Sequence, residues 1–420
     1  MKIKKDIWIP NILFGYEYII NIKQNSIFFC LKGENFDGNQ FALQALSKGA
    51  LHVVTEDTTL SGRDDCTVVS NTLETLQMLA QYHRRHLTIP IIGITGTNGK
   101  TTTKELTAAV LSRKFKTAFT QGNLNNHIGV PLTLLSIKPT DEVAIVEMGA
   151  NHPGEIEELC KISEPDFGII TNIGTAHIEG FLSIENIIST KKALYQSVIK
   201  NKGTLFVNEI DSVLTNGLNY SRVIYYGGQK EGTLNSTITK MDPYLTLNLF
   251  KKEFRTQLTG SYNLNNILCA ATIGRYFGVL DEDIIAAIAN YTPKNNRSQI
   301  ITAGSNTLIA DYYNANPSSM QAALENFRAI DTTPKMVILG EMRELGDYSK
   351  IEHKKIIEWC IAQNIPAILI GKEFYQHKEP TLQYFETLEK AQDFITENPI
   401  KNHFILIKGS HGVHLERLRI

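Results

Sequence analysis

Cysteine is scarce in this sequence of 420 residues, and its placement argues against two classes of protein. The chain has five cysteines, at positions 30, 66, 160, 269 and 360, and none of them forms a Cys-x-x-Cys pair. An odd number of widely spaced thiols argues against a disulfide framework and against a zinc cluster. We therefore expect a protein of a reducing compartment, the cytoplasm.

An excess of one sign of charge is also lacking. Lys and Arg together number 42 and Asp and Glu 43, so the formal net charge is -1 at pH 7. Such a chain has no overall field that attracts nucleic acid or an anionic membrane, and we expect neither as a partner. Any phosphate-bearing ligand must then be held by a local site.

Long apolar runs are absent as well. No stretch of about 18 apolar residues occurs, so no segment is expected to span a bilayer. Near the N-terminus, Lys4 and Lys5 precede an apolar stretch, but Pro10 and Glu17 interrupt it and no small-residue cleavage site follows. We interpret this segment as the start of a domain.

The length and the patterning predict three domains of α/β class, because one hydrophobic core rarely serves 420 residues. Residues 1–86 combine short β-like runs with a helix-like stretch at 39–49, which is typical of a small α/β domain. Residues 87–296 alternate apolar runs with helical segments, which predicts a mostly parallel sheet; the runs are 89–95, 142–148, 166–173 and 203–208. Residues 297–420 repeat the alternation and predict a second, smaller doubly wound domain; the runs are 307–312, 335–342, 366–372 and 403–409, with helices expected at 318–329 and 349–363.

The strongest local motif is GITGTNGKTTTKE at 93–105, between a predicted strand and a helix expected to continue through Phe115. A glycine-rich turn there can aim backbone N–H groups and a helix N-terminus at phosphates, with Lys100 adding a cation and Thr101 a hydroxyl for magnesium. The strict GxxxxGK[ST] pattern is missed, because Ile94 occupies the first glycine position. The alternative is a turn rich in glycine in a protein that binds no nucleotide.

Two further predicted strands deliver polar groups to the same sheet edge, where ligands of parallel sheets bind. Glu147 ends one strand and suits magnesium, and His177 follows another in GTAHIEGF. Alone, Glu147 is equally an ordinary carboxylate at a strand end, and His177 a loop histidine. With a phosphate loop on the same edge, both become candidates for binding one magnesium nucleotide.

Several other polar residues have structural as well as functional interpretations. The Asn-rich stretch QGNLNNHIGVP at 121–131 is compatible with plain turns, and Asn263 with the N-cap of a helix. The same alternatives apply to Arg297, Asp311 and Lys408.

Eight motifs in one order closely resemble the Mur ligases: GITGTNGKTTTKE, GNLNNHIGVPLTLL, VEMGANHPGEI, TNIGTAHIEGF, GSYNLNNILCAA, YNANPSSM, GEMRELGD and IKGS. The resemblance runs from about residue 26 to the C-terminus. It implies an N-terminal domain that holds a UDP-sugar peptide, a central P-loop ATPase domain, and a Rossmann-like C-terminal domain that contributes to binding ATP and the incoming amine. The shifted glycine of the phosphate loop is normal in this family.

The resemblance also implies roles for individual residues. The β- and γ-phosphates of ATP are expected on Lys100 and the loop residues Gly96, Thr97, Asn98, Gly99, Thr101 and Thr102. Thr101 and Glu147 are expected to hold one Mg²⁺ and His177 a second, while Asn263 and Asn266 lie beside adenine, Arg297 reaches phosphate and Asp311 lies near the ribose.

Members of this family carry a carbamylated lysine shortly after the histidine. The spacing favours Lys191, which follows His177 by 14 positions (191 − 177 = 14), and Lys192 remains the alternative. A CO2 adduct converts a cation that repels magnesium into an anion that binds or orients it. A pair of solvated helix lysines is the structural alternative.

The resemblance implies an ATP-dependent ligase of cell-wall precursor synthesis that works through an acyl phosphate. The expected substrates are a UDP-N-acetylmuramoyl-tripeptide, whose third residue is diaminopimelate or lysine, and D-alanyl-D-alanine, and the expected state is a monomer. The sequence departs from the family pattern at residues 20–22, where a contact to UDP is usual, and at Asn39, Ala310 and His411. These departures keep two alternatives open: a ligase acting on another carboxylate and amine, or a nucleotide-binding homologue without catalysis.

Overall fold

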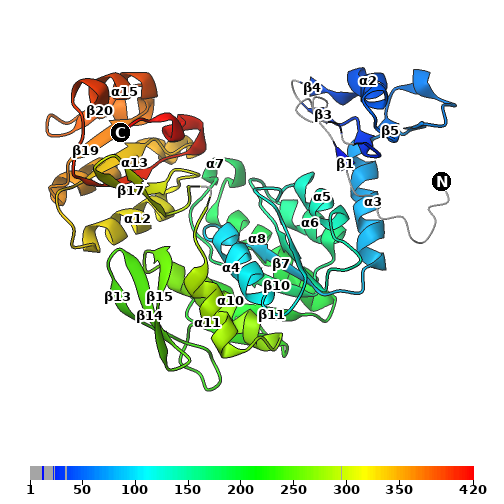
Figure 1. Ribbon diagram of the computed structural model, residues 1–420, viewed down its shortest axis with the longest axis horizontal. Helices are drawn as coiled ribbons and strands as arrows, with labels where there is room; N and C mark the ends of the chain where they lie inside the picture. The colour runs from blue at the N-terminus through cyan, green and yellow to red at the C-terminus, as the bar shows by residue number, and fades with distance from the viewer. Residues whose placement is uncertain (1–11, 14–21, 23, 34–35, 295) are drawn as a thin grey trace.

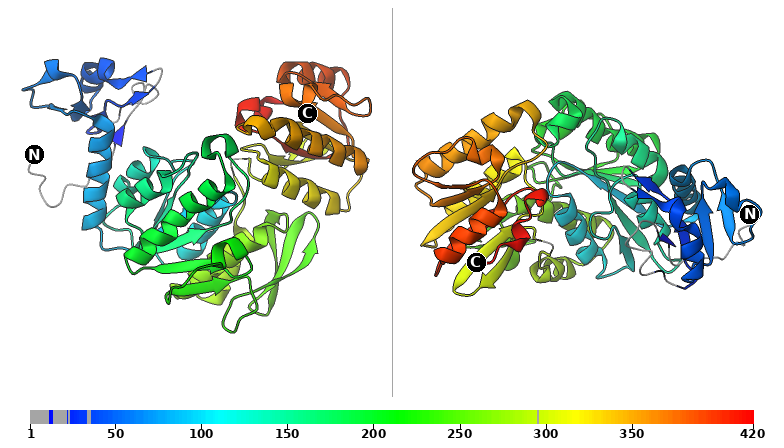
Figure 2. Two further views of the ribbon diagram at one scale, coloured as in Figure 1. Left: turned by 180° about the vertical axis from the view of Figure 1, so that it is seen from behind. Right: turned by 90° about the horizontal axis from the view of Figure 1, so that it is seen from above.

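The computed structural model describes residues 12–13, 22, 24–33, 36–294 and 296–420. Its sheets form three bodies, which we call the N-terminal, central and C-terminal bodies (Figure 1). Seen from behind and from above, the central body lies between the other two (Figure 2). Among the described residues, no helix combines the length and the apolar character needed to cross a membrane.

The N-terminal body is built on four parallel strands in the order β1-β2-β5-β6. Their bounds are Ile12–Leu13, Ile27–Phe29, His52–Thr55 and Cys66–Val68, accompanied by the hairpin β3 (Lys32–Gly33) and β4 (Phe36–Asp37), the 3₁₀ turns Gly38–Phe41 and Thr58–Leu60, and helix α2 (Ala42–Ser47). The expected UDP contact at residues 20–22 lies outside the described residues except for Ile22, which packs against this body's core.

Asn39 has a structural role in this body. Its Oδ1 accepts hydrogen bonds from Thr55 Oγ1 at 2.6 Å and from the Glu56 N–H at 2.8 Å, and its Nδ2 donates to Asp37 at 2.7 Å. The amide therefore fastens the hairpin to the end of β5 and satisfies the buried Thr55 hydroxyl.

Helix α3 (Thr72–His86) connects the N-terminal and central bodies and packs on both. It begins at Asn71, whose side chain accepts the Glu74 N–H, and its buried residues include Leu76 and Ala80. These two share one core cluster with Phe29 of β2 and with two helices of the central body, α5 (Gly129–Leu135) and α6 (Glu155–Ser163). The boundary expected after residue 86 thus falls at the end of a helix that contacts both neighbours.

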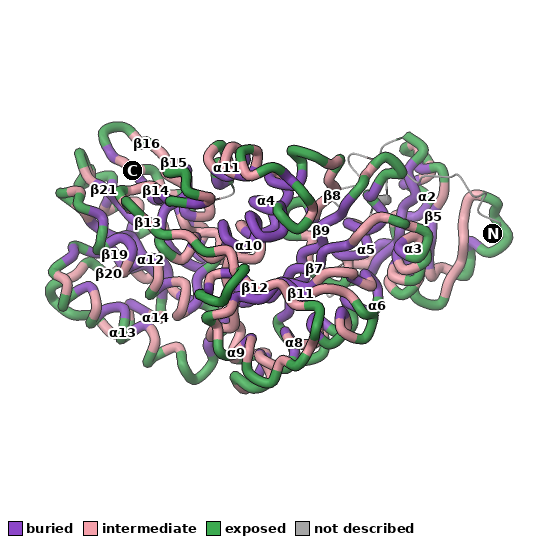
Figure 3. Tube along the Cα trace, turned by 90° about the horizontal axis from the view of Figure 1, so that it is seen from below, coloured by how far each residue is buried: buried purple, intermediate pink, exposed green. Residues whose placement is uncertain are grey.

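The central body contains six parallel strands in the order β12-β11-β10-β7-β9-β8. Their bounds are Ile91–Thr95 (β7), Thr117–Phe119 (β8), Val143–Glu147 (β9), Phe167–Ile170 (β10), Thr204–Asn208 (β11) and Val223–Tyr226 (β12). Alternate residues face opposite layers, so Ile91 packs with one helical layer and Ile92 with the other. The four inner strands, β11, β10, β7 and β9, are mostly buried (Figure 3), as expected from their continuous apolar runs, and the edge strands β8 and β12 are partly exposed.

Two layers of helices cover this sheet. One layer contains α4 (Lys100–Leu111), α10 (Asn263–Tyr276) and α11 (Asp281–Asn290). The other contains α3, α5 (Gly129–Leu135), α6 (Glu155–Ser163) and α8 (Ile184–Lys200). Two short helices lie on connections of the chain: α7 (Ile178–Phe181) between β10 and α8, and α9 (Ser212–Thr215) between β11 and β12. The predicted helix after the phosphate loop is shorter than expected: α4 ends at Leu111, and Phe115 lies beyond it, packed edge-on against Phe277.

An antiparallel sheet that the sequence analysis did not predict extends the central body. Its strands β13 (Thr237–Met241), β14 (Tyr244–Leu249) and β15 (Lys252–Thr259) are paired in sequence order. Leu245, Leu247 and Leu258 bury one face of this sheet in the core that α4, α10 and α11 share.

The C-terminal body contains a second six-stranded sheet, in the order β16-β17-β21-β18-β19-β20. The strands are β16 (Gln299–Ala303), β17 (Asn306–Asp311), β18 (Lys335–Gly340), β19 (Ala367–Ile370), β20 (Gln383–Phe385) and β21 (Phe404–Lys408). Only β16 is antiparallel, paired with β17 at the edge. The surrounding helices are α12 (Pro317–Ala329), α13 (Ser349–Ala362), α14 (Lys372–Tyr375) and α15 (Leu388–Glu397), with 3₁₀ turns at Gly346–Tyr348, His411–Val413 and Leu415–Arg417. The expected doubly wound arrangement is therefore present, with one added edge strand.

Candidate active site

A cavity of about 520 Å³ lies where the carboxyl ends of the two six-stranded sheets meet. The central body contributes Glu147 from the end of β9 and Asn172 from beyond β10, and the C-terminal body contributes Asp311 from β17 and Lys408 from β21. The phosphate loop forms another part of the wall. Parallel sheets bind ligands at this edge, so the fold places two such edges around one space.

The phosphate loop connects β7 to α4 through two glycines with positive φ, Gly96 at 146° and Gly99 at 79°. A Cβ at residue 96 would lie 2.0 Å from Thr171 Oγ1, and a Cβ at residue 99 would lie 2.6 Å from Asn266 Oδ1. Only glycine fits either position without moving a neighbour. Because α4 starts at Lys100, its free N–H groups point toward the cavity side of the turn and favour an anion there.

Lys100 is folded back on this loop. Its Nζ donates to the carbonyl oxygens of Gly96 at 2.9 Å and Thr97 at 3.1 Å. Burial lowers the pKa of Lys100, the charge of Glu147 raises it, and Arg297 lowers it further. The ammonium therefore lacks a full anionic partner, which a phosphate group at this position supplies.

Glu147 is almost completely buried, with an exposed fraction of 1%. Its Oε1 accepts hydrogen bonds from Thr101 Oγ1 at 3.1 Å and Asn125 Nδ2 at 2.9 Å. Its Oε2 has no hydrogen-bond partner and lies 3.8 Å from the Nζ of the buried Lys104. A buried carboxylate oxygen without a partner is costly, and a bound cation is one way to satisfy it.

His177 immediately precedes α7 and adopts a left-handed backbone conformation, with φ of 53°. Its Nδ1 contacts Glu344 Oε2 of the C-terminal body. Burial lowers the pKa of His177, the Glu344 carboxylate raises it, and Lys100 and Lys191 lower it. The histidine thus lies at the boundary of the two bodies while it still faces the phosphate loop.

Lys191 and Lys192 point to different places. Lys191 is buried on α8, and its Nζ donates to the Gly96 carbonyl oxygen at 3.1 Å from behind the loop. Burial, aided by the charge of Lys100, lowers the pKa of Lys191 to about 7. Lys192 instead donates to the Asn216 carbonyl oxygen at 3.5 Å, away from the loop.

Asn263 and Asn266 line the cavity but are bonded within the central body. Asn263 is the first residue of α10, not its N-cap, and its Nδ2 donates to the Thr259 carbonyl oxygen at 2.7 Å. Asn266 donates to Asn263 Oδ1 at 2.8 Å and accepts from Thr103 Oγ1 at 3.1 Å. These bonds tie α10 to the phosphate-loop helix and leave the amides at the cavity wall.

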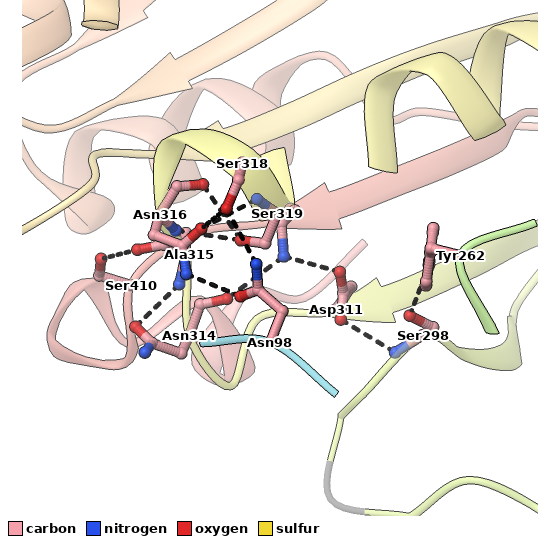
Figure 4. A network of polar contacts seen from close by, with 11 residues as sticks. Asn98, Tyr262, Ser298, Asp311, Asn314, Ala315, Asn316, Ser318, Ser319 and Ser410 are labelled. Carbon is pink, nitrogen blue, oxygen red and sulfur yellow. Dashed lines mark hydrogen bonds and ion pairs between the residues drawn. The ribbon is translucent and has the colours of Figure 1, made fainter. Parts of the chain in front are cut away.

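Arg297 and Asp311 form the wall that links the central and C-terminal bodies. The Arg297 guanidinium lies 3.8 Å from the centre of the Tyr313 ring. Asp311 accepts from Lys408 Nζ at 2.7 Å and from the Ser298 N–H at 3.0 Å. Figure 4 shows the bond from Ser298 and, next to it, the contact of Ser298 with Tyr262. Arg297 therefore presents a stacked cation, whereas the Asp311 carboxylate already has two partners.

The structure thus brings together most of the residues that the sequence indicated. The cavity is lined by Thr97, Asn98, Gly99, Lys100, Thr101, Thr102, Glu147, His177, Asn263, Asn266, Arg297 and Asp311. Gly96, a residue of the loop, and Lys191 are not among its lining residues, and the Lys191 Nζ donates a hydrogen bond to the Gly96 carbonyl oxygen. Among the described residues, no three His, Cys, Asp or Glu side chains gather closely enough to hold a metal ion by themselves.

A second, smaller cavity of about 210 Å³ adjoins the first one through His177, Asn314 and Asn316. It is lined mainly by loops of the C-terminal body and contains Arg343 and Glu344, which carry opposite charges. No role for either residue was expected from the sequence, although the motif GEMRELGD contains both. The sequence did offer one signal for such a role, since both charged residues directly follow the predicted strand at 335–342.

Comparison with known proteins places this site in a class. Residues 94–274 match the Mur ligase middle domain, and residues 296–411 match the Mur ligase glutamate ligase domain. The chain is 32% identical over 412 residues to a protein of Bacillus subtilis strain 168, covering 94% of this chain and 90% of that relative. The chain therefore belongs to the Mur ligase family, which confirms the resemblance seen in its motifs.

Within this family, the relatives indicate one kind of ligase. The Bacillus protein is named UDP-N-acetylmuramoyl-tripeptide–D-alanyl-D-alanine ligase, and so is a relative from Escherichia coli K12 that is 30% identical over 423 residues, 93% of this chain and 89% of the relative. Among solved structures, MurF from Acinetobacter baumannii has a TM-score of 0.86 at 28% identity, covering 98% of this chain and 92% of the other. MurF ligase from Thermotoga maritima in complex with ADP has a TM-score of 0.85 at 26% identity, covering 99% and 97%. The expected α/β class and the three-domain architecture are confirmed.

Proposed function

We propose that the protein joins D-alanyl-D-alanine to UDP-N-acetylmuramoyl-tripeptide with the hydrolysis of ATP to ADP, a step of peptidoglycan precursor synthesis. The relatives support this assignment along nearly the whole chain. The observation that carries it is a single cavity shared by the phosphate loop, Glu147, His177 and the Arg297 and Asp311 wall. Such a cavity suits the transfer of a phosphoryl group from ATP to a carboxylate.

The phosphate loop is the expected site of the β- and γ-phosphates. Two loop glycines allow backbone N–H groups to approach the ligand closely, and the N-terminus of α4 favours negative charge. Lys100 is held by carbonyl oxygens only and is free to exchange them for a phosphate. Elsewhere on the cavity wall, Asn263 and Asn266 are expected to border the adenine, Arg297 to reach phosphate, and Asp311 to lie near the ribose.

Mg²⁺ fits the donors around Glu147. The Oε2 atom of Glu147 is buried without a hydrogen bond, and the other oxygen of this carboxylate contacts the Thr101 hydroxyl. A hard cation therefore finds two oxygen donors there, Glu147 Oε2 and Thr101 Oγ1. His177 is the candidate for a second metal ion. When bound, Mg²⁺ neutralises phosphate charge and aligns the terminal phosphoryl group. The described residues supply too few ligands without the phosphates of the nucleotide.

Lys191 is the proposed carbamylated residue, because CO2 reacts with a neutral amine. Its pKa of about 7 gives it a substantial neutral fraction near neutral pH, and it borders the loop. Lys192 instead donates to the Asn216 carbonyl oxygen and does not border the loop. Incubation with ¹³C-bicarbonate should give a carbamate signal in the ¹³C spectrum that disappears in Lys191→Met and persists in Lys192→Met; the reverse pattern would reassign the modification.

The smaller cavity suits the incoming dipeptide. D-alanyl-D-alanine has small side chains, a carboxylate at one end and an ammonium at the other. Arg343 and Glu344 offer one charge for each end, and the cavity touches His177, next to the expected phosphoryl group. A Cβ at residue 412 would lie 2.2 Å from an Arg343 guanidinium nitrogen, so Gly412 makes room for this cation.

The mechanism follows from these placements. The terminal carboxylate of the tripeptide attacks the γ-phosphorus, and the bond to the bridging oxygen breaks, which yields an acyl phosphate and ADP. Lys100 and the loop N–H groups stabilise the charge on the transferred group. The dipeptide ammonium first loses a proton to solvent, and the free amine attacks the acyl carbon. The resulting tetrahedral intermediate expels phosphate, which takes up the second proton of the nitrogen as the amide forms. The C-terminal body covers the cavity and limits hydrolysis of the acyl phosphate.

The N-terminal body, residues 1–86, is the proposed holder of the UDP end, with residues 87–296 as the ATPase domain and 297–420 as the acceptor domain. We assign the reaction to the cytoplasm, because ATP and UDP-linked precursors are found there. We also propose a monomer, since one chain supplies the described lining of both cavities.

Turnover with defined substrates tests the function. The purified protein with ATP, Mg²⁺, UDP-N-acetylmuramoyl-tripeptide and D-alanyl-D-alanine should release phosphate and form the pentapeptide product, detected by mass spectrometry, and Lys100→Ala should abolish both. Selective turnover of another carboxylate and amine would instead indicate a ligase of different specificity. ADP binding without turnover of any such pair would indicate a homologue without catalysis.

A further inference from the structure

The tip of the phosphate loop contacts the C-terminal body through one side chain. Asn98 Nδ2 donates to Ser318 Oγ at 2.9 Å, Ser318 Oγ donates to Asn316 Oδ1 at 2.9 Å, and Asn316 Nδ2 donates back to Asn98 Oδ1 at 2.8 Å. The three side chains thus form a closed ring of hydrogen bonds, drawn in Figure 4. We call this the Asn98 ring.

The Asn98 ring joins parts of the chain that are 220 positions apart in sequence. On one side, Asn316 is the N-cap of α12, where its Oδ1 also accepts the Ser319 N–H. On the other side, the Asn98 amide belongs to the phosphate loop itself. The same asparagine therefore fixes the start of a helix in one body and the tip of a ligand-binding loop in the other.

The backbone of Asn98 is fixed from the central body as well. Its N–H donates to Asn172 Oδ1 at 3.0 Å, and its carbonyl oxygen accepts from Thr171 Oγ1 at 2.6 Å and Asn172 Nδ2 at 2.9 Å. The loop tip lies between the end of β10 and the start of α12. Its conformation then depends on both bodies being in place.

Separating the two bodies would break two hydrogen bonds of the ring, because the bond between Ser318 and Asn316 lies within the C-terminal body. Asn316 is buried, with 7% of its surface exposed, and Asn98 and Ser318 are half-buried. If the bodies part, water replaces these partners, but if a single partner is removed while they stay together, buried polar atoms remain unpaired. The contact is therefore specific for this arrangement of the two bodies.

We propose that Asn316 and Ser318 are positioning residues for the phosphate loop, and that through Asn98 they couple docking of the C-terminal body to nucleotide binding. Because coupling between two equilibria is reciprocal, docking strengthens nucleotide binding by the same factor by which nucleotide strengthens docking. The inference depends on the proposed function only in that a nucleotide binds this loop.

Ser318→Ala tests the coupling, with Ser319→Ala as the matched control. Ser319 is the next residue and completes the capping box of α12 with Asn316, but it does not belong to the Asn98 ring. Both variants lose one helix-terminal hydroxyl, and only Ser318→Ala opens the ring. Ser318→Thr retains a hydroxyl and should behave as the original chain.

Two measurements on the full chain decide the proposal. By isothermal titration, ADP should bind Ser318→Ala about 5- to 10-fold more weakly than it binds the original chain, as expected for the loss of a partly buried hydrogen-bonded group. By small-angle scattering without nucleotide, Ser318→Ala should have a larger radius of gyration, which saturating ADP restores. Ser319 lines the cavity but is not part of the ring, so Ser319→Ala should weaken ADP binding less than Ser318→Ala does and should leave the radius of gyration unchanged.

Equal effects of Ser318→Ala and Ser319→Ala would overturn the proposal, because helix capping would then explain them. So would a change in only one of the two quantities, because coupling requires both. If the original chain itself bound no ADP, the proposed function would fail, and the scattering comparison between the two variants would still show whether the ring holds the bodies together.

Discussion

The two bodies that surround the cavity supply charged groups in different ways. From the central body come buried groups: Glu147 has 1% of its surface exposed and Lys191 4%. The C-terminal body also buries one ion pair, Lys408 with Asp311, but at the smaller cavity its loop after β18 supplies side chains that are 54% exposed for Arg343 and 57% for Glu344. Buried groups are held in place before any ligand arrives, and for Lys191 burial also lowers the pKa. Exposed groups acquire a fixed geometry only when a substrate or the neighbouring body contacts them.

This contrast suggests that the buried groups of the central body serve the chemical step and that the exposed groups of the C-terminal loop serve substrate recognition. Substitutions on the central wall should lower the rate of the chemical step, and substitutions on the C-terminal loops should weaken binding of one substrate. Each of the following predictions would sharpen or break that separation.

The largest effect is expected for Lys191→Met. Loss of the proposed carbamate removes an anion beside the phosphate loop, and we expect kcat to fall by about 1,000-fold or more with little change in KM for ATP. Phosphate release in the steady state measures both. Lys192→Met, altered at the adjacent position, should stay within about twofold of the original chain. If Lys192→Met lost most of its kcat while Lys191→Met remained active, Lys191 would not take part in the chemical step, and the assignment of the chemistry to buried groups of the central body would lose its main support.

The burial of Lys191 also predicts how stability depends on pH. Its pKa is lowered from 10.5 to about 7 in the folded chain, so between those values the unfolded chain binds more protons, and stability must rise with pH. In that window the gain is up to about 1.4 kcal/mol per pH unit for a single group. Denaturant unfolding in CO2-free buffers, compared with Lys191→Met, isolates this contribution. Parallel pH profiles of the two chains would show that Lys191 is not a buried neutral amine.

On the C-terminal wall, Arg343→Met should act on one substrate only. If the guanidinium binds the dipeptide carboxylate, KM for D-alanyl-D-alanine should rise about 10- to 100-fold, with KM for ATP and for the tripeptide substrate nearly unchanged. Arg328→Met is the control, because Arg328 pairs with Glu325 on α12 and is not among the residues that line either cavity.

A substrate without the carboxylate sharpens this test. The amino alcohol analogue of the dipeptide should be a poor acceptor for the original chain, and Arg343→Met should lose little further with it. If Arg343→Met instead lowered kcat equally for both acceptors, the exposed loop would belong to the chemical step and the comparison would fail.

The sequence predicted the parts of the site that depend on local pattern. Three groups of residues were predicted to lie at the ends of strands, because each follows or ends an apolar run: Gly96–Lys100, Glu147 and His177. The parallel sheet of the central body brings these strand ends together. The strands β13–β15 were missed because their half-exposed residues show no buried run, and their packing depends on α11.

Contacts between distant segments were beyond sequence patterns. Ser318 reads as an ordinary first-turn helix residue, and only the folded chain brings it to Asn98. The choice between Lys191 and Lys192 likewise rests on which side of α8 faces the loop, which spacing alone leaves open. Asn263 was open to interpretation as an N-cap, yet α10 begins one residue earlier than that role requires, so its amide is available to Thr259 and Asn266.

The smallest effect is expected where the two walls touch, at Gly174. Its N–H donates to Thr97 Oγ1 at 2.9 Å, and a Cβ there would lie 3.0 Å from Ser318 Oγ, close enough to displace that hydroxyl by a few tenths of an ångström. Gly174→Ala should therefore strain the Asn98 ring without removing a member, and weaken ADP binding by about twofold. Gly33→Ala, where no atom lies within 4 Å of the added methyl group, provides the control in the titration. A loss as large as that of Ser318→Ala would mean that the contact tolerates no displacement. If ADP binding were not weakened at all, α12 would be able to shift without cost. The central and C-terminal walls would then be less tightly coupled than their hydrogen bonds indicate.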